Sequence, residues 1–140
     1  MFNYACKYRC VYALIDPRNN EVFYIGQTCN PEKRLIEHII SATGVWHSLT
    51  QEQYFLITDK QYRIAEIKKE CGKNPQMKII LDGQYTYSEI CKIETQIIKD
   101  HTNQGIALTN TNKIMREKQR IAQEAHCEKY LIEWHNQHAT

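Results

Sequence analysis

The segment from residue 9 to residue 26 constrains the fold more than any other part of this sequence. Residues 9–15, Arg-Cys-Val-Tyr-Ala-Leu-Ile, are rich in β-branched and aromatic side chains, and residues 21–26, Glu-Val-Phe-Tyr-Ile-Gly, have the same character. Between them stands Asp-Pro-Arg-Asn-Asn at 16–20, a run of residues that favour turns. We therefore expect a β-hairpin over 9–26, closed by a loop of about five residues.

A helix is predicted to follow this hairpin. Asn30 and Pro31 stand in the preferred order for a helix start, because a side-chain cap precedes a proline whose missing N–H costs nothing there. The pattern predicts that this helix ends near Ser41. Its apolar stripe is expected to consist of Leu35, Ile36, Ile39 and Ile40. Arg34 and His38 are four residues apart, so they point in the same direction.

Residues 42–85 are predicted to contain a connection, a helix and a strand. Residues 42–58 show no clean periodicity, which indicates an irregular connection. Asp59 is expected to cap a helix that ends at Gly72, since glycine is the usual residue just beyond a helix end. Met-Lys-Ile-Ile-Leu at 77–81 is predicted to be a third strand, closed by Asp82 and Gly83.

The next helix carries an unusual inward carboxylate. Thr86 and Glu89 have the spacing of a capping box. One helix face is expected to consist of Tyr87, Ile90, Cys91, Ile97, Ile98 and His101. At 100° per residue, Glu94 falls about 40° from Ile90 and about 60° from Ile97, inside this face. A carboxylate that points inward requires a partner, because burying an unpaired charge is costly.

The last thirty residues are amphipathic. Their apolar positions at helical spacing are Ile114, Ile121, Ala125 and Ile132. Isolated helices are marginal in water, so we expect this segment to pack on the core or on a second copy of the chain, forming a homodimer. The predicted architecture is α+β: a small, mainly antiparallel three-stranded sheet flanked by helices in a domain over 1–110, with a C-terminal helical extension over 111–140.

Composition excludes several classes of protein. The chain has 140 residues, of which 42% are hydrophobic and 24% charged, as expected for one globular domain. Its longest apolar runs fall well short of the roughly 20 residues needed to span a bilayer, so we expect no membrane insertion. The N-terminus lacks the pattern of a secretion signal, which favours a cytoplasmic location and free thiols for the six cysteines.

The net charge of +2 is too small to indicate a nucleic-acid partner, but the positive charges are clustered. The two basic segments contain Lys60, Arg63, Lys68, Lys69 and Lys73, and then Lys113, Arg116, Lys118 and Arg120. Either segment could follow a phosphate backbone. For any such run taken alone, a solvated helix surface is the favoured interpretation.

Five separated elements resemble, in order and spacing, the GIY-YIG nuclease domain. They are Cys10-Val11-Tyr12; Phe23-Tyr24-Ile25-Gly26; Gln27-Thr28-x-Asn30-Pro31-x-x-Arg34-x-x-x-His38; Glu94; and Asn110. The resemblance covers roughly residues 9–110. Two departures are that Cys10 replaces the first glycine of the motif and that Gln27 stands where some members carry a lysine near the phosphate.

The resemblance implies a DNA endonuclease that depends on Mg²⁺ or Mn²⁺. In that interpretation Glu94 binds the metal through oxygen, and Arg34 holds the phosphate. Tyr12 would accept the proton of the attacking water, which requires Arg34 and the metal to lower the phenol pKa from its ordinary value near 10. Tyr24, His38 and Asn110 would orient the phosphate, the water or the leaving group. Expected DNA contacts come from Gln27, Lys68, Lys69, Lys113, Arg116 and Arg120.

Other interpretations of the same residues stay open. Taken singly, Tyr12 and Tyr24 are typical of core packing, Arg34 of a surface salt bridge with Glu37, and His38 of a helix border. The chain could be a catalytically silent DNA-binding module of the same fold, or a structural partner that assembles through its C-terminal segment. The sequence does not indicate which DNA is recognised; it favours loose specificity or recognition of DNA shape.

Overall fold

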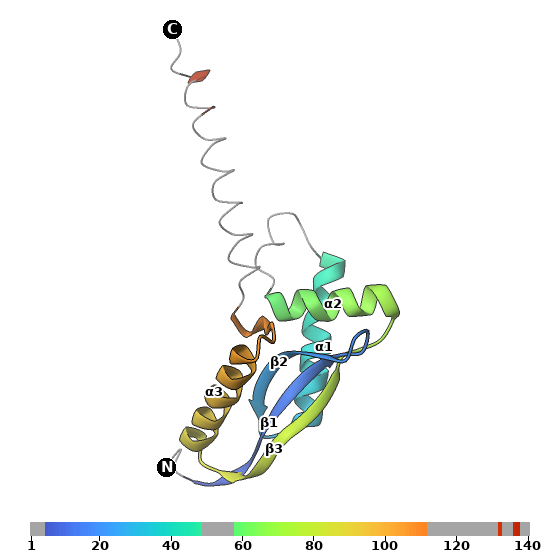
Figure 1. Ribbon diagram of the computed structural model, residues 1–140. Coiled ribbons are helices and arrows are strands. Elements are labelled where there is room, and N and C mark those ends of the chain that lie inside the picture. The colour runs from blue at the N-terminus through green and yellow to red at the C-terminus, as the bar shows by residue number, and fades with distance from the viewer. Residues whose placement is uncertain (1–4, 49–57, 112–131, 133–135, 138–140) are drawn as a thin grey trace.

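The computed structural model describes residues 5–48 and 58–111, together with residues 132, 136 and 137; the side chains at 43–48 and 111 are not described. One sheet contains the three strands β1 (Lys7–Asp16), β2 (Glu21–Thr28) and β3 (Gln76–Tyr85). The helices of the described residues are α1 (Pro31–Ser48), α2 (Asp59–Cys71), α3 (Tyr87–Asn103) and the short 3-10 helix η2 (Thr109–Thr111). The helices α1 and α2 cover one face of the sheet, and α3 covers the other (Figure 1).

The predicted α+β fold with a three-stranded antiparallel sheet is confirmed. The strand order is β2-β1-β3, and both pairings are antiparallel. The predicted hairpin of β1 and β2 is present, with Leu14 opposite Tyr24 and Ile15 opposite Val22. This register leaves Phe23 as an extra residue, a β-bulge that lets the side chains of both Phe23 and Tyr24 pack on the side of α1 and α2.

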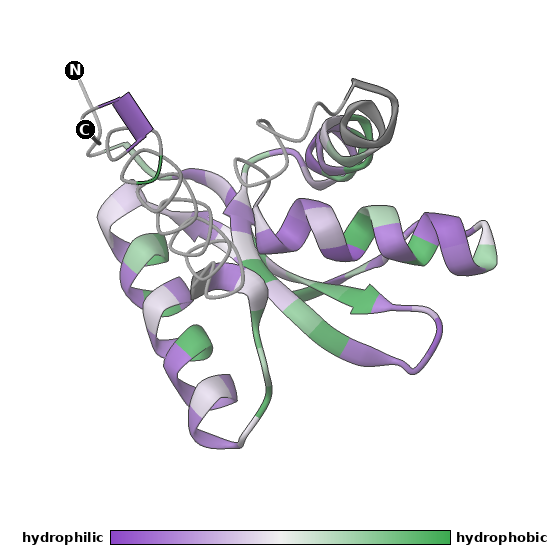
Figure 2. Cartoon of the chain, turned by 90° about the horizontal axis from the view of Figure 1, so that it is seen from above, coloured by the Kyte–Doolittle hydropathy of each residue, from purple (hydrophilic) through white to green (hydrophobic). Residues whose placement is uncertain are grey.

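Alternation along β1 divides the core into two clusters, one on each face of the sheet. The cluster under α1 and α2 contains Tyr12, Leu14, Phe23, Ala42, Ile64 and Ile67. The cluster under α3 contains Val11, Ala13, Ile25 and Ile90. Figure 2 shows the same division, with hydrophobic residues along the strands and on the inner sides of the helices. The central strand β1 is therefore buried on both faces, and it fixes the position of Tyr12 within the sheet.

Helix α1 begins at Pro31 as predicted but continues to Ser48, seven residues beyond the predicted end at Ser41. Gly44 lies within the helix, where a glycine costs only about 1 kcal/mol relative to alanine. The predicted apolar stripe is wrong in part, because Ile36 and Ile40 are 57% and 65% exposed. The face that packs on the sheet contains Leu35, as predicted, and His38 and Ala42 in place of these two isoleucines.

Helix α2 begins at Asp59, one residue earlier than predicted, and ends where expected. The N-cap is Thr58, whose side chain accepts a hydrogen bond from the backbone N–H of Gln61, while the Gln61 side chain accepts one from the backbone of Thr58. Asp59 is the first helical residue and is buried, so its predicted capping role is wrong. Gly72 adopts the left-handed conformation at the C-terminus, which confirms the predicted end.

Strand β3 passes through the predicted stop. Asp82 and Gly83 pair with Cys10 and Arg9, so the long partner strand extends the pairing beyond the local turn residues. The capping box of Thr86 and Glu89 at the start of α3 is confirmed. On the predicted apolar face of α3, Ile90 is fully buried and Ile97 packs against the sheet, but Tyr87 is 54% exposed and stacks with Arg9 instead.

The edge strand β2 is closed by η2. The Thr109 hydroxyl donates to the carbonyl oxygen of Phe23 at 2.8 Å. The amide of Asn110 donates to the carbonyl oxygen of Ile25 at 2.7 Å and accepts from its N–H at 3.1 Å. These contacts cover backbone groups that an edge strand would otherwise expose. The predicted helix over 111–140 lies almost entirely outside the described residues, among which no helix is long and apolar enough to cross a membrane.

Candidate active site

Two tyrosines of the hairpin lie side by side on the face of the sheet below α1. Tyr12 is opposite Gly26, so Tyr24, two residues before Gly26, is its diagonal neighbour across the strands. Their ring centroids are 6.3 Å apart. Gly26 makes this arrangement possible, since a Cβ there would lie 2.5 Å from the Tyr12 hydroxyl oxygen and 2.9 Å from Cε1 of Tyr24. The motif glycine is therefore a steric requirement of the pair.

His38 of α1 completes an aromatic cluster with the two tyrosines. Its Nε2 lies 2.7 Å from the Tyr12 hydroxyl oxygen, and its ring centroid is 5.4 Å from that of Tyr24. The side chain is 1% exposed, and its Nδ1 has no hydrogen-bond partner among the described residues. Burial, and then the positive charges of Lys60 and Arg34, lower the pKa of His38 to about 3. The imidazole is consequently neutral at physiological pH.

Arg34 lies one helical turn before His38 and forms an ion pair with Glu37 at 3.0 Å. Its guanidinium is partly exposed, so it borders both the cluster and solvent. The charge of Arg34 acts to lower the pKa of Tyr12, Tyr24 and His38. The prediction that Arg34 and His38 point together is thus confirmed, although the two residues differ in exposure.

The Tyr12 phenol has a raised pKa in the free protein. Burial raises its pKa far above the ordinary value, the neighbouring Tyr24 raises it further, and Arg34 opposes these effects without overcoming them. The pKa of Tyr24 is also raised, mainly by burial. Arg34 alone therefore does not lower the pKa of Tyr12 below its ordinary value, because desolvation of the phenolate outweighs one nearby cation.

Glu94 reaches the same site from α3. Its side chain is half-buried, and burial raises the pKa of its carboxyl group. The negative charge of Glu94 acts to raise the pKa of Tyr12, Tyr24 and Tyr87, so its carboxylate lies within electrostatic range of all three phenols. Among the residues that the structure describes, it forms neither a hydrogen bond nor an ion pair. The inward carboxylate predicted from helical periodicity is present.

A single half-buried carboxylate without a protein partner suits a hard divalent cation. Mg²⁺ and Mn²⁺ are commonly held by one or two carboxylates and retain several water molecules. The described residues contain no group of three or more His, Cys, Asp or Glu side chains that could hold a metal ion. The donor set around Glu94 therefore fits a cation that binds through one carboxylate, water and a substrate oxygen.

Lys60 is a member of the site that the sequence analysis did not assign to it. Its Nζ lies 5.1 Å from the centroid of the Tyr24 ring. Burial and the like charge of Arg34 lower the pKa of Lys60. In the sequence it belongs to a basic run that is typical of a solvated surface. The signal that could have distinguished Lys60 from the other basic residues is the start of α2 at residue 59, because the helix directs this side chain towards the sheet.

Two predicted site residues have side-chain groups that are already engaged within the protein. Both hydrogen-bonding atoms of the Asn110 amide contact the backbone of Ile25. The Gln27 amide donates to Sγ of Cys91 at 3.2 Å, which links β2 to α3. Asn110 therefore holds the strand next to Tyr24, and Gln27 braces the helix that carries Glu94.

The predicted DNA contacts on α2 lie away from this site. Lys68 and Lys69 are exposed at the C-terminal end of α2, roughly 12 Å along the helix from Lys60 at 1.5 Å per residue. The Lys68 ammonium donates to the carbonyl oxygen of Gly72 at 3.2 Å. Lys113, Arg116 and Arg120 lie outside the described residues.

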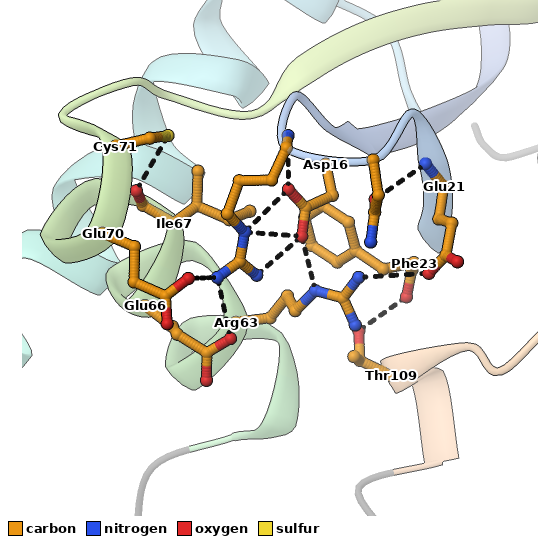
Figure 3. Close-up of polar contacts among 11 residues, drawn as sticks. Asp16, Glu21, Phe23, Arg63, Glu66, Ile67, Glu70, Cys71 and Thr109 are labelled. Atoms are coloured by element: carbon orange, nitrogen blue, oxygen red, sulfur yellow. Dashed lines mark hydrogen bonds and ion pairs between the residues drawn. The ribbon is translucent and has the colours of Figure 1, made fainter.

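A second polar cluster, which the sequence analysis missed, fastens α2 to the hairpin (Figure 3). Asp16 is fully buried, and its carboxylate accepts from Arg18 at 2.7 Å and from Arg63 at 2.9 Å. Arg18 also pairs with Glu66 and Glu70 of α2. Burial acts to raise the pKa of Asp16, but hydrogen bonds from Arg18 and Arg63 lower it to about 2. Asp16 had been assigned only to the turn.

Comparison with known protein families gives a match over most of the chain. The model of the GIY-YIG catalytic domain matches residues 8–107, well over half of the 140-residue chain. This range contains both tyrosines, Arg34, His38, Lys60 and Glu94. No curated protein and no solved structure shows significant similarity to the chain.

Proposed function

Because the chain belongs to the GIY-YIG family, whose catalytic domains are nucleases, we propose that it is a divalent-metal-dependent DNA endonuclease that hydrolyses phosphodiester bonds at the Tyr12 site. One observation carries this proposal: the buried hydrogen bond between Tyr12 and His38, 2.7 Å long, lies beside the guanidinium of Arg34 and within electrostatic range of Glu94. A core that served packing alone would gain little from this concentration of polar groups.

Hydrolysis of a phosphodiester requires a nucleophile, a proton acceptor and neutralisation of the charge that develops on the phosphate oxygens. Arg34 suits the last task, since a guanidinium keeps its proton and can donate two parallel hydrogen bonds to a phosphate. Its partly exposed position lets it contact a phosphate at the surface while its charge still acts on both phenols.

The proton path is expected to use Tyr12 and His38 together. Tyr12 keeps its proton, so it cannot act as a phenolate in the free protein. It can instead receive the proton of the attacking water on its oxygen while it transfers its own proton to Nε2 of His38, which is neutral. The water becomes hydroxide, whose oxygen forms a bond to phosphorus as the bond from phosphorus to the leaving oxygen breaks, and His38 becomes an imidazolium. The negative phosphate beside it offsets the positive charges that disfavour this form in the free protein.

Glu94 is the residue that would hold Mg²⁺ or Mn²⁺. When bound, such a cation lowers the pKa of a coordinated water molecule and stabilises negative charge on the phosphate oxygens. Tyr24 borders the cluster on its other side, and Asn110 keeps the edge of β2 in place behind it. In this proposal Asn110 positions Tyr24 and does not touch the phosphate.

The direct test is cleavage of supercoiled plasmid with Mg²⁺ or Mn²⁺ by the wild-type chain and by Glu94→Ala. We expect nicked or linear product from the wild type, and a loss of at least about a thousandfold in rate for the variant. If both proteins bind DNA and leave it intact with either metal, the chain is a silent DNA-binding module of this fold.

The DNA substrate is proposed from what surrounds the site. The sequence carries no zinc-finger or helix-turn-helix signature for readout of the major groove. We therefore expect loose sequence specificity or recognition of DNA shape. A panel of duplex, nicked, flap and branched DNA, with the cut positions sequenced, tests this. Tight binding to one short duplex sequence would contradict it.

A further inference from the structure

Lys60 is held beside the reacting groups by a helix with a fixed position. It is the second residue of α2, directly after a capped N-terminus, and its Nζ lies over the Tyr24 ring at 5.1 Å from the centroid. The side chain is half-buried. A lysine with its ammonium group at this depth does not have the free rotation of a surface lysine.

Arg63, one turn later on the same side of α2, shows why the helix cannot easily shift. Its guanidinium contacts the buried Asp16 at 2.9 Å and lies 5.3 Å from the centroid of the Phe23 ring. Residues three apart on a helix lie next to each other, so anchoring Arg63 also fixes Lys60. The cluster around Asp16 therefore sets the position of the Lys60 ammonium relative to Tyr24.

The two cations of α2 differ in their anionic partners. Arg63 pairs with Asp16 and lies 3.7 Å from Glu21. Lys60 forms no ion pair with any carboxylate of the described part of the chain. It lies instead near a second cation, Arg34, and both positive charges act on the same neutral His38. Half-buried like charges are unfavourable unless an anion joins them.

We propose that Lys60 contacts the phosphate that is hydrolysed, together with Arg34, and is a further catalytic residue of this site. The proposal rests on the proposed nuclease function. A phosphodiester carries one negative charge, and a second develops as the water attacks, so two cations from α1 and α2 match the charge of the transition state better than one. Lys60 supplies a compact point charge where Arg34 supplies a planar pair of donors.

The test compares Lys60→Met, Lys60→Arg and Lys99→Met in single-turnover cleavage of the DNA that the wild type cuts. Lys99 is exposed on α3 and offers the same chemical change away from the site. At saturating DNA we expect Lys60→Met to lower the rate constant about a hundredfold, as for loss of one transition-state donor. Lys60→Arg keeps the charge and should stay within about tenfold of the wild type, and Lys99→Met within about twofold.

Circular dichroism and the unfolding temperature establish that each variant is folded; if Lys60→Met does not fold, Lys60→Gln takes its place with the same expected outcomes. A Lys60→Met rate equal to that of Lys99→Met would overturn the role of Lys60 and leave the nuclease function intact. A fall in the cleavage rate constant as large for Lys60→Arg as for Lys60→Met would also overturn it. That pattern would indicate that the shape of the side chain matters and its positive charge does not.

DNA binding without metal separates this inference from the nuclease proposal. Fluorescence anisotropy at several salt concentrations should show a salt slope for Lys60→Met that is smaller than the wild-type slope by about 0.9, the value for one lost phosphate contact. Lys99→Met should keep the full slope. If the wild type binds DNA without cutting it and Lys60→Met shows this smaller slope, the nuclease function is refuted and the phosphate contact of Lys60 stands. An unchanged slope for Lys60→Met refutes the contact itself.

Discussion

The cluster around Asp16 and the cluster around Tyr12 lie at two points along α2, and they handle buried charge in opposite ways. At Asp16 the two arginines meet one buried carboxylate and three more carboxylates at the rim. At Tyr12, Lys60 lacks a carboxylate partner among the described residues, and His38 has an unpartnered ring nitrogen. The first arrangement is complete within the protein and stabilises the fold. In the proposed function, a phosphate and a divalent cation complete the second.

The largest expected effect tests the chemical side of this contrast. Tyr12→Phe removes the hydroxyl group that links the attacking water to His38. Cleavage should fall by about 10²–10⁴-fold, the range for loss of a proton-transfer group. Stability should fall by only about 1–3 kcal/mol, because His38 Nε2 loses its partner. Single-turnover rates and urea unfolding measure the two quantities, and Tyr85→Phe on β3 is the control, with cleavage unchanged. A fully active Tyr12→Phe would remove Tyr12 from the mechanism.

The next effect tests the structural side. Asp16→Asn leaves Arg18 and Arg63 without their shared buried carboxylate, and loss of one partner of such a group costs about 3–5 kcal/mol. We expect this loss in the free energy of unfolding, with cleavage by the remaining folded protein within about tenfold of wild type. Asp82→Asn is the control, because Asp82 is exposed and its carboxylate accepts a hydrogen bond from the Tyr8 hydroxyl. A stable Asp16→Asn with abolished cleavage would reverse the assigned roles of the two clusters.

Acid should destabilise the two clusters in separate pH ranges. The pKa of His38 is about 3 in the folded protein, against a reference value of 6.5. The contribution of the neutral imidazole to the free energy of unfolding is therefore complete above about pH 6.5 and is lost as the pH falls. The loss amounts to roughly 3 kcal/mol by about pH 4. The pKa of Asp16 falls from 3.8 to about 2, so its contribution of roughly 2 kcal/mol is lost only below about pH 4.

Urea unfolding of the wild type, His38→Gln and Asp16→Asn at several pH values measures both ranges. His38→Gln should lose little stability between about pH 7 and pH 4, and Asp16→Asn should lose little below about pH 4. Equal losses in the wild type and His38→Gln over the upper range would show that His38 is not held neutral by its surroundings.

The last expected effect concerns the geometry around Tyr12, and it is among the smallest in the free energy of unfolding. Gly26→Ala places a methyl group 2.5 Å from the Tyr12 hydroxyl oxygen, so the ring must move. We expect a stability loss of about 1–3 kcal/mol from overpacking and a fall in cleavage of about a hundredfold from misplacement of the phenol. Gly72→Ala provides the comparison: its positive φ of 70° makes alanine unfavourable, but nothing lies nearby. It should lower stability while leaving cleavage unchanged. Equal cleavage by both variants would contradict the tight fit at Tyr12.

The hairpin, the sheet and the first turns of the helices were predictable, because each depends on local chemistry. The turn at 16–20, the proline at the start of α1, the capping box at Thr86 and the glycine at the end of α2 all act within a few residues. Tyr12, Tyr24, Arg34, His38 and Glu94 were identified because their spacing resembles one family. Periodicity independently placed Glu94 on the inner face of α3.

The remaining features depend on contacts between distant residues. Lys60 and Arg63 look like surface cations until α2 is placed over the hairpin. Asp16 looks like a turn residue until two arginines surround it. His38 lies on the packed face of α1, and Ile36 and Ile40 do not, because the Tyr12 hydroxyl offers His38 a buried hydrogen-bond partner. The raised pKa of Tyr12 follows from burial by several elements together, which no local pattern reports.

The most direct measurement is a crystal structure of the chain with Ca²⁺ and a duplex that the wild type cuts. We predict one phosphate within hydrogen-bonding distance of the Arg34 guanidinium, the Lys60 ammonium and the Tyr12 hydroxyl, with the cation between that phosphate and the Glu94 carboxylate. A complex in which the DNA backbone crosses another surface of the protein, while the Tyr12 cluster is unchanged and the cation binds elsewhere, would contradict this prediction.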